Sequence, residues 1–160
     1  RDMGAAMSPF NAFMFIQGLE TLALRIREHS KNADEIAKFL MSHPKVERVS
    51  HPSVASDLAK ERADKYLSGG CGGLMGFEIK GGIEAGKQFI NSLEMFYHVA
   101  NIGDSRSLAI HPASTTHSQL NEEELLSAGV TPGYVRLSIG LEHLDDIKDD
   151  LTQALDKVSV

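Results

Sequence analysis

Apolar side chains recur every three or four residues through the first quarter of the chain. Ser8 and Pro9 open this stretch in a way typical of a helix start, because serine caps free amides and proline at the first helical position loses no hydrogen bond. The spacing predicts one long helix over 9–42, or two helices with a break near Asn32. Phe15 and Ile16 widen the apolar stripe, so we expect this helix to be covered on more than one side.

Strand and helix patterns alternate through the rest of the chain. Strands are predicted over 46–50, 74–80, 95–100 and 134–139, and helices over 57–67, 83–93, 121–129 and 144–158. In the last strand the period of two places Val135, Leu137 and Ile139 on one face, with Arg136 and Ser138 on the other. The order predicts an α+β sandwich of a small sheet with helices.

The stretch over 101–119 is too rich in Ser, Thr and His to be predicted as a core element. Loops of this length usually serve a function. His111 and His117 both lie in it, and they are compatible with catalysis, metal ligation or hydrogen bonds that stabilise the loop. We expect the last of these.

Composition narrows the class of protein. The chain has 160 residues, 42% of them apolar, and a formal charge of −6, which is typical of one globular domain and unfavourable for binding nucleic acid or acidic membranes. A single cysteine cannot form an internal disulfide, so we expect a reducing, cytoplasmic environment. The apolar opening is interrupted by polar residues and does not predict a membrane span. Because residue 1 is Arg rather than Met, we expect a fragment or processed piece.

Two glycine-rich segments could be taken for a phosphate-binding loop and a reactive-cysteine site, but their residues favour structural turns. The segment 81–88 nearly matches a phosphate-binding loop, but Gln88 replaces the required Ser or Thr and Glu84 would repel phosphate, so a tight turn into a helix is expected. The glycines around Cys71 precede a strand and indicate a flexible turn, with an inert thiol. No histidine pair has zinc-hydrolase spacing and no nucleophile-elbow motif occurs, so neither a metal site nor a hydrolase triad is predicted.

Arg136 is the strongest candidate for a binding residue. A guanidinium on a rigid strand, directed away from the apolar face, suits bidentate capture of a carboxylate. From the spacing alone, a solvated arginine on the sheet surface is the favoured interpretation, because charged side chains are mostly exposed. The pattern alone therefore leaves both interpretations open.

Four segments together resemble the Cys/Met-metabolism family of pyridoxal phosphate (PLP) enzymes. These segments are 101–120, 129–142 with its Val-Arg-Leu-Ser run, 7–13, and 17–22. The resemblance implies the C-terminal domain of a fold-type I PLP enzyme, with a mainly antiparallel sheet, helices packed on one face and a preceding linker helix. It implies a long helical segment over 1–42 that links to an upstream PLP-binding domain, and a substrate-carboxylate-binding domain over 43–160.

The resemblance also implies roles for individual residues. Arg136 would bind the α-carboxylate of an amino-acid substrate, and Asn101 and Thr116 would help to orient it. The lysine that holds PLP in this family lies in a Ser-x-Thr-Lys segment, and the nearest approach here, Ser42-His-Pro-Lys45, departs from it. We therefore expect PLP to be bound by the upstream domain, with no catalytic lysine in this chain.

The implied reaction replaces the acetoxy group of O-acetyl-L-homoserine with sulfide or a thiol. Asn101 favours this reaction, because relatives that eliminate from methionine or cystathionine usually carry Ser at that position. Cystathionine synthesis and methionine γ-elimination remain alternatives, as does a free-standing module that binds amino acids or mediates assembly without catalysis. The expected partners are the upstream domain or chain and further copies in a homotetramer.

Overall fold

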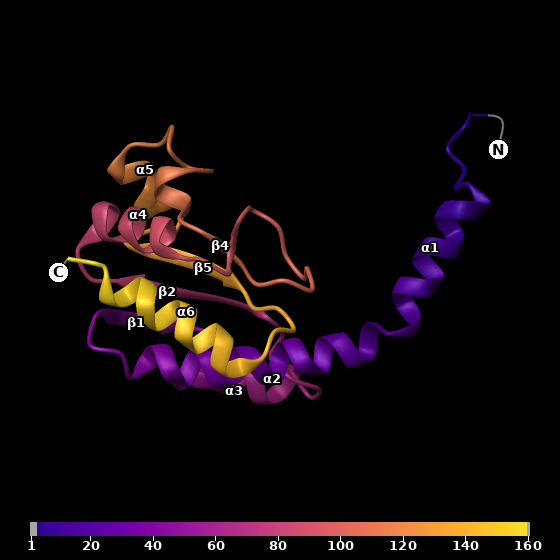
Figure 1. Cartoon of the computed structure of the whole chain (residues 1–160), viewed down its shortest axis with the longest axis horizontal. Coiled ribbons are helices and arrows are strands. Elements are labelled where there is room, and N and C mark those ends of the chain that lie inside the picture. Colours follow the sequence, from indigo (N-terminus) through magenta and orange to yellow (C-terminus); the bar gives the residue numbers. More distant parts are fainter. Residues whose placement is uncertain (1–2, 160) are drawn as a thin grey trace.

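The structure, a computed structural model, describes residues 3–159. Figure 1 shows a compact body from which the first helix projects. The helices are α1 (Pro9–Glu20), α2 (Leu22–Met41), α3 (Asp57–Tyr66), α4 (Gly82–Ser92), α5 (Glu122–Ser127) and α6 (Leu144–Asp156), with 3-10 turns η1 (Pro52–Val54) and η2 (Pro112–Ser114). The strands are β1 (Val46–Ser50), β2 (Leu74–Ile79), β3 (Tyr97–His98), β4 (Leu108–Ile110) and β5 (Tyr134–Ser138).

The five strands form one sheet in the order β1-β2-β5-β4-β3. Strand β2 pairs with β1 and β5, and β4 pairs with β5, all antiparallel, whereas the short β3 runs parallel to β4. The predicted α+β fold with a mainly antiparallel sheet is confirmed. Strand β5 lies at the centre of the sheet, so both of its neighbours fix its register.

The main core lies between one face of the sheet and helices α2, α4 and α6. Side chains that alternate along β2 and β5 meet side chains at helical spacing on these three helices, as the sequence patterns predict. Figure 1 shows α6 lying across the sheet, with α2 beside it. The largest fully buried members are Phe77, Phe89, Ile36, Leu40, Ile79, Leu137, Ile139, Ile147, Leu151 and Leu155.

The break in the N-terminal helix falls at Thr21, so the expected position near Asn32 is wrong. Gly18 and Thr21 are weak helix formers, whereas Asn32 is buried in an unbroken helix. The Arg25 guanidinium bonds both to the Thr21 hydroxyl and, at 2.9 Å, to the carbonyl oxygen of Gly18. This side chain therefore satisfies backbone that the break leaves free.

Helix α1 buries none of its residues against the rest of the described chain. Phe10, Phe13, Phe15 and Ile16 are all more than half exposed. The predicted cover for this apolar surface is thus not supplied by residues 3–159, and it stays a prediction.

Two predictions around 95–119 are wrong. The strand expected over 95–100 is limited to Tyr97 and His98, and the segment expected to be only a loop contains β4 and η2. Strand β4 has just three residues, all of them buried, and it pairs with β5 through Leu108 and Ile110. Three apolar residues inside a polar stretch are too few to show a period, which explains why the pattern missed them.

Buried Asp150 on α6 fixes the chain before β3. Its carboxylate accepts hydrogen bonds from the backbone N–H groups of Glu94 and Met95, both at 2.9 Å, and of Phe96 at 3.2 Å. These three donors cannot join a strand ladder, so β3 begins only at Tyr97. A buried carboxylate that accepts three backbone bonds is expected to contribute strongly to stability.

Substitution of this carboxylate tests the interpretation. We expect Asp150→Ala to lower the free energy of unfolding by about 1–3 kcal/mol, because it leaves buried N–H groups without partners. Asp149→Ala removes an exposed carboxylate one residue earlier and should change the free energy by less than about 0.5 kcal/mol. Urea unfolding of both variants measures the difference, and equal effects would contradict the assigned role.

Candidate functional site

An open cleft of about 1240 Å³ lies over the sheet face opposite the main core. Its walls come from β1, η1, α3, β2 and β5, and from short segments around 112–117 and 128–130. Helix α3 thus borders this second face, whereas the other long helices of the body cover the first. The cleft is concave and combines apolar side chains with a few polar ones, which makes it a candidate for a ligand site.

The charge of the cleft is positive although the whole chain carries −6. Arg48, Arg62 and Arg136 contribute to its lining, and no aspartate or glutamate does so among the described side chains. None of these three arginines forms an ion pair within the described residues. Unpaired guanidinium groups in a concave site favour an anionic ligand.

Arg136 reaches the cleft because of the alternation along β5. Val135 and Leu137 are fully buried on the core face, which directs Arg136 to the other face. There it stands opposite Gly76 of β2 and Ile110 of β4. A residue without a side chain on one neighbouring strand leaves room beside the guanidinium stem.

The backbone of Asn101, rather than its side chain, contacts Arg136. Nη2 of Arg136 donates to the carbonyl oxygen of Asn101 at 3.4 Å, while the Asn101 side chain accepts from the N–H of Ile102. The Gly103 N–H donates to the buried hydroxyl of Ser138 at 3.0 Å, which fastens this loop to β5. The structure therefore brings Asn101 and Arg136 together, with the Asn101 side chain turned to its own loop.

Thr116 is not part of the cleft lining. Its side chain is exposed, and its hydroxyl lies 2.8 Å from Nδ1 of His117, which does line the cleft. Of the three residues singled out from the sequence, Arg136 faces the cleft, Asn101 contacts Arg136, and Thr116 reaches the rim only through its neighbour.

The run from Ser138 to Glu142 is held by a polar cluster behind the cleft. The Glu142 carboxylate accepts from the N–H of Ser107 at 2.6 Å and from its hydroxyl at 2.9 Å, and that hydroxyl accepts from the N–H of Gly140. A Cβ on Gly140 would overlap the Glu142 carboxylate, which explains the glycine. The cluster fixes the Ser107 end of the loop over 101–107 relative to β5.

Helix α2 secures the same run from the other side. A ring nitrogen of His29 lies 2.6 Å from the carbonyl oxygen of Ile139, and the Asn32 amide donates to the carbonyl oxygens of Gly140 and Glu142. Buried polar groups usually find such partners. Sequence reasoning missed His29 and Asn32, because their partners lie more than 100 residues away.

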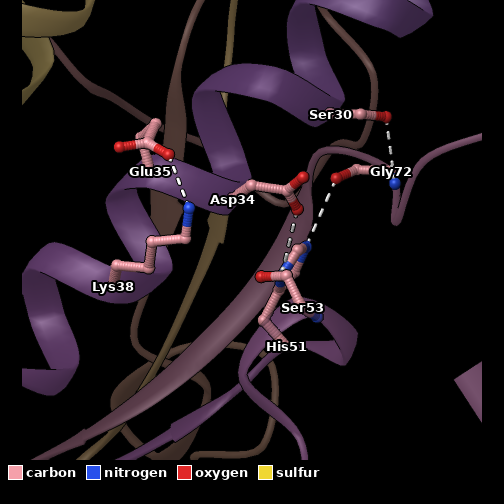
Figure 2. A network of polar contacts seen from close by, with 7 residues as sticks. All are labelled: Ser30, Asp34, Glu35, Lys38, His51, Ser53 and Gly72. Atoms are coloured by element: carbon pink, nitrogen blue, oxygen red, sulfur yellow. Dashed lines mark hydrogen bonds and ion pairs between the residues drawn. The ribbon is translucent and has the colours of Figure 1, made fainter. Parts of the chain in front are cut away.

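A polar network joins α2 to the edge of the cleft at His51 (Figure 2). Nδ1 of His51 lies 2.7 Å from the Ser53 hydroxyl and 3.8 Å from Oδ1 of Asp34, and Nε2 lies 3.4 Å from the carbonyl oxygen of Gly72. Ser30 holds the same loop through the N–H of Gly72. Because serine and aspartate approach the same ring nitrogen, the imidazole cannot relay a proton between them.

His111 is fully buried and structural, as expected of a loop-stabilising residue. Its ring nitrogens lie 2.8 Å from the hydroxyl of Ser114 and 2.8 Å from the carbonyl oxygen of Pro132. Its ring also packs against Gly86, where any Cβ would collide with it. The glycine in the 81–88 segment thus serves helix packing, and the turn at Gly81 and Gly82 has the positive φ angles expected of a tight turn.

Neither the Cys71 thiol nor the Lys45 amine is placed to act as a nucleophile. Burial, together with Asp34 and Asp64, raises the pKa of the Cys71 thiol, which is the opposite of nucleophile activation. Lys45 donates to the carbonyl oxygens of Leu155, Asp156 and Val158 and so caps the end of α6. No group of three potential metal ligands gathers within residues 3–159, and no helix there is long and apolar enough to cross a membrane.

Comparison with known proteins gives matches over nearly the whole chain. The family model described as Cys/Met metabolism PLP-dependent enzyme matches residues 1–156. O-acetyl-L-homoserine sulfhydrylase of Leptospira meyeri is 56% identical over 159 residues, covering 99% of this chain and 36% of the relative. L-methionine gamma-lyase of Fusobacterium nucleatum subsp. polymorphum is 43% identical over 159 residues, again covering 99% of this chain, and 40% of the relative.

A solved structure agrees with these matches. It is described as an O-acetylhomoserine (thiol)-lyase from Campylobacter jejuni with a pyridoxyl-lysine phosphate, and it superposes with a TM-score of 0.88 at 49% identity. The alignment covers 98% of this chain and 37% of that one. The chain therefore spans little more than a third of the length of such relatives.

The buried histidines predict how stability depends on pH. Burial lowers the pKa of His51 and His111 below 6.5, so below that pH the unfolded chain takes up protons that the folded chain does not. Urea unfolding should show stability falling as the pH drops from about 7.5 to about 5.5, with little change from about 7.5 to 8.5. The fall should be smaller in His111→Asn, and an unchanged fall would contradict the prediction.

Proposed function

Because the chain belongs to the family of Cys/Met metabolism PLP-dependent enzymes, we propose that it supplies the substrate-carboxylate site of a transferase acting on O-acetyl-L-homoserine. The reaction replaces the acetoxy group with sulfide or a thiol and gives homocysteine or a thioether. The observation that carries the proposal is Arg136, which faces an open cleft lined by arginines and by no described acidic side chain.

Arg136 binds the α-carboxylate of the amino acid through its planar fork of donors. The central strand holds its backbone, and the Asn101 carbonyl holds one end of the guanidinium at 3.4 Å. In this proposal Asn101 orients Arg136, and Thr116 supports His117 at the rim. Such positioning matters for rate, since a misplacement of about 1 Å can cost on the order of 100-fold.

The lysines of this chain do not fit the role of cofactor attachment. None lines the cleft within the described residues, and Lys45, the nearest approach to the family motif, is engaged at the end of α6. PLP would therefore be held by another part of the complete protein. In enzymes of this type PLP supplies the electron sink, while the protein supplies positioning and charge.

Residues 1–42 would connect this domain to the PLP-binding part, and residues 43–160 would form the carboxylate-binding domain. The exposed apolar side chains of α1 support that division, because helices with no buried face need a partner. A homotetramer in the cytoplasm completes the proposal, and the single cysteine is compatible with a reducing compartment.

A second reaction has support from the methionine gamma-lyase relatives, which are 43–44% identical to this chain. Their similarity extends over the same residues as that of the sulfhydrylases. Asn101 favours the sulfhydrylase, as the family pattern implies. Analysis of the products formed from O-acetyl-L-homoserine with sulfide, and from L-methionine alone, separates the two reactions.

Arg136→Lys in the complete protein tests the carboxylate site. The variant keeps the charge and loses the fork, so we expect KM for O-acetyl-L-homoserine to rise about 10- to 100-fold while PLP content stays unchanged. Arg27→Lys, an exposed arginine of α2 outside the cleft, serves as the matched control. Unchanged kinetics in Arg136→Lys would show that the assignment is wrong.

Native mass spectrometry tests the role of α1. When the PLP-binding part is supplied as a separate polypeptide, the 17.4 kDa chain should form a complex with it. The double substitution Phe13→Ser with Phe15→Ser should weaken that complex about tenfold or more, because two large apolar side chains lose their burial. Leu126→Ser changes an exposed apolar residue of α5 and should leave the complex intact. If both variants weaken the complex equally, or if neither weakens it, the proposed contact is refuted.

A further inference from the structure

The side chain of Tyr134 lies across β2 rather than above its own cross-strand partner. Tyr134 pairs with Glu78 in the register of β2 and β5, yet a Cβ built on Gly76 would overlap both the hydroxyl and the ring of Tyr134. The ring therefore leans two residues along β2. Because Gly76 is the direct partner of Arg136, this lean brings the phenol beside Arg136 in the cleft.

The Tyr134 hydroxyl has no hydrogen-bond partner among the described residues, although the ring is half-buried. Burial raises the pKa of Tyr134, and the charges of Arg136 and Arg48 only partly offset this effect. The phenol therefore keeps its proton at neutral pH and is available as a donor. The hydroxyl is not one of the buried polar atoms that lack a partner, so it is open to the cleft and can donate to a ligand there.

The surroundings of this hydroxyl favour a negatively charged acceptor. Arg136 on the same strand and Arg48 on β1 both act on it electrostatically. The carboxylate of Glu78, the cross-strand partner of Tyr134, already accepts from the Thr131 hydroxyl and from the N–H of Gly133. The phenol and Arg136 are thus two donors on one strand, two residues apart, that face the same space.

We propose that the Tyr134 hydroxyl is a further binding group for the amino acid, donating a hydrogen bond to the carboxylate that Arg136 binds. Gly76 is the residue that makes this possible, because it leaves the space that the ring occupies. The pair makes the site selective for α-amino acids over the corresponding amines. This inference rests on the proposed carboxylate site of Arg136.

Calorimetry on the complete protein, with the PLP-binding part in place, tests the inference. The probes are L-norleucine, which has the amino acid head but no leaving group, and n-pentylamine, the same molecule without its carboxylate. We expect Tyr134→Phe to weaken L-norleucine about tenfold, as for the loss of one hydrogen bond to a charged group, and to leave n-pentylamine unchanged. Gly76→Ala, which displaces the ring, should weaken L-norleucine in the same way.

The outcomes separate this inference from the proposed function. If Arg136→Lys weakens L-norleucine and Tyr134→Phe does not, the carboxylate site stands and the role of Tyr134 is refuted. If Tyr134→Phe weakens both probes equally, the hydroxyl acts on another group and the inference is wrong. If Arg136→Lys leaves L-norleucine binding unchanged, the proposed site itself is refuted, and the inference falls with it.

Discussion

The alternation of β5 is the constraint on which the rest of the structure depends. Val135 and Leu137 are fully buried against the helices, so Tyr134 and Arg136 must face the opposite side. A shift of one residue in register would exchange the two sets and place a guanidinium in the core. Antiparallel pairing on both sides of β5 prevents such a shift. Burial of the apolar side chains of β5 therefore also directs Tyr134 and Arg136 toward the cleft.

Most of the polar motif around this strand serves to hold backbone rather than to meet a ligand. Glu142 and Ser107 fix the loop that carries Asn101, and Asn32 of α2 fixes the carbonyl groups that follow β5. Glycine stands at 140 because a side chain there would meet the Glu142 carboxylate. A long run of polar residues can thus mark a rigid support, with only one or two side chains left for binding.

The local patterns predicted most of the fold, and they failed where contacts are distant. Period two identified β5 and the outward direction of Arg136, and helical spacing identified α6. The three-residue β4 carries too short a pattern, and the start of β3 depends on Asp150, 54 residues from Phe96. Arg136 could be found from spacing and resemblance together. The lean of Tyr134 over Gly76 and the backbone contact of Asn101 depend on tertiary packing, which no local pattern contains.

A crystal structure of the complete protein with L-norleucine tests the central claim most directly, because it locates the carboxylate. The account predicts that both carboxylate oxygens lie within hydrogen-bond distance of the Arg136 guanidinium, on the sheet face opposite the main core. A carboxylate bound elsewhere, with the Arg136 side chain paired to an acidic residue of the protein, would contradict it.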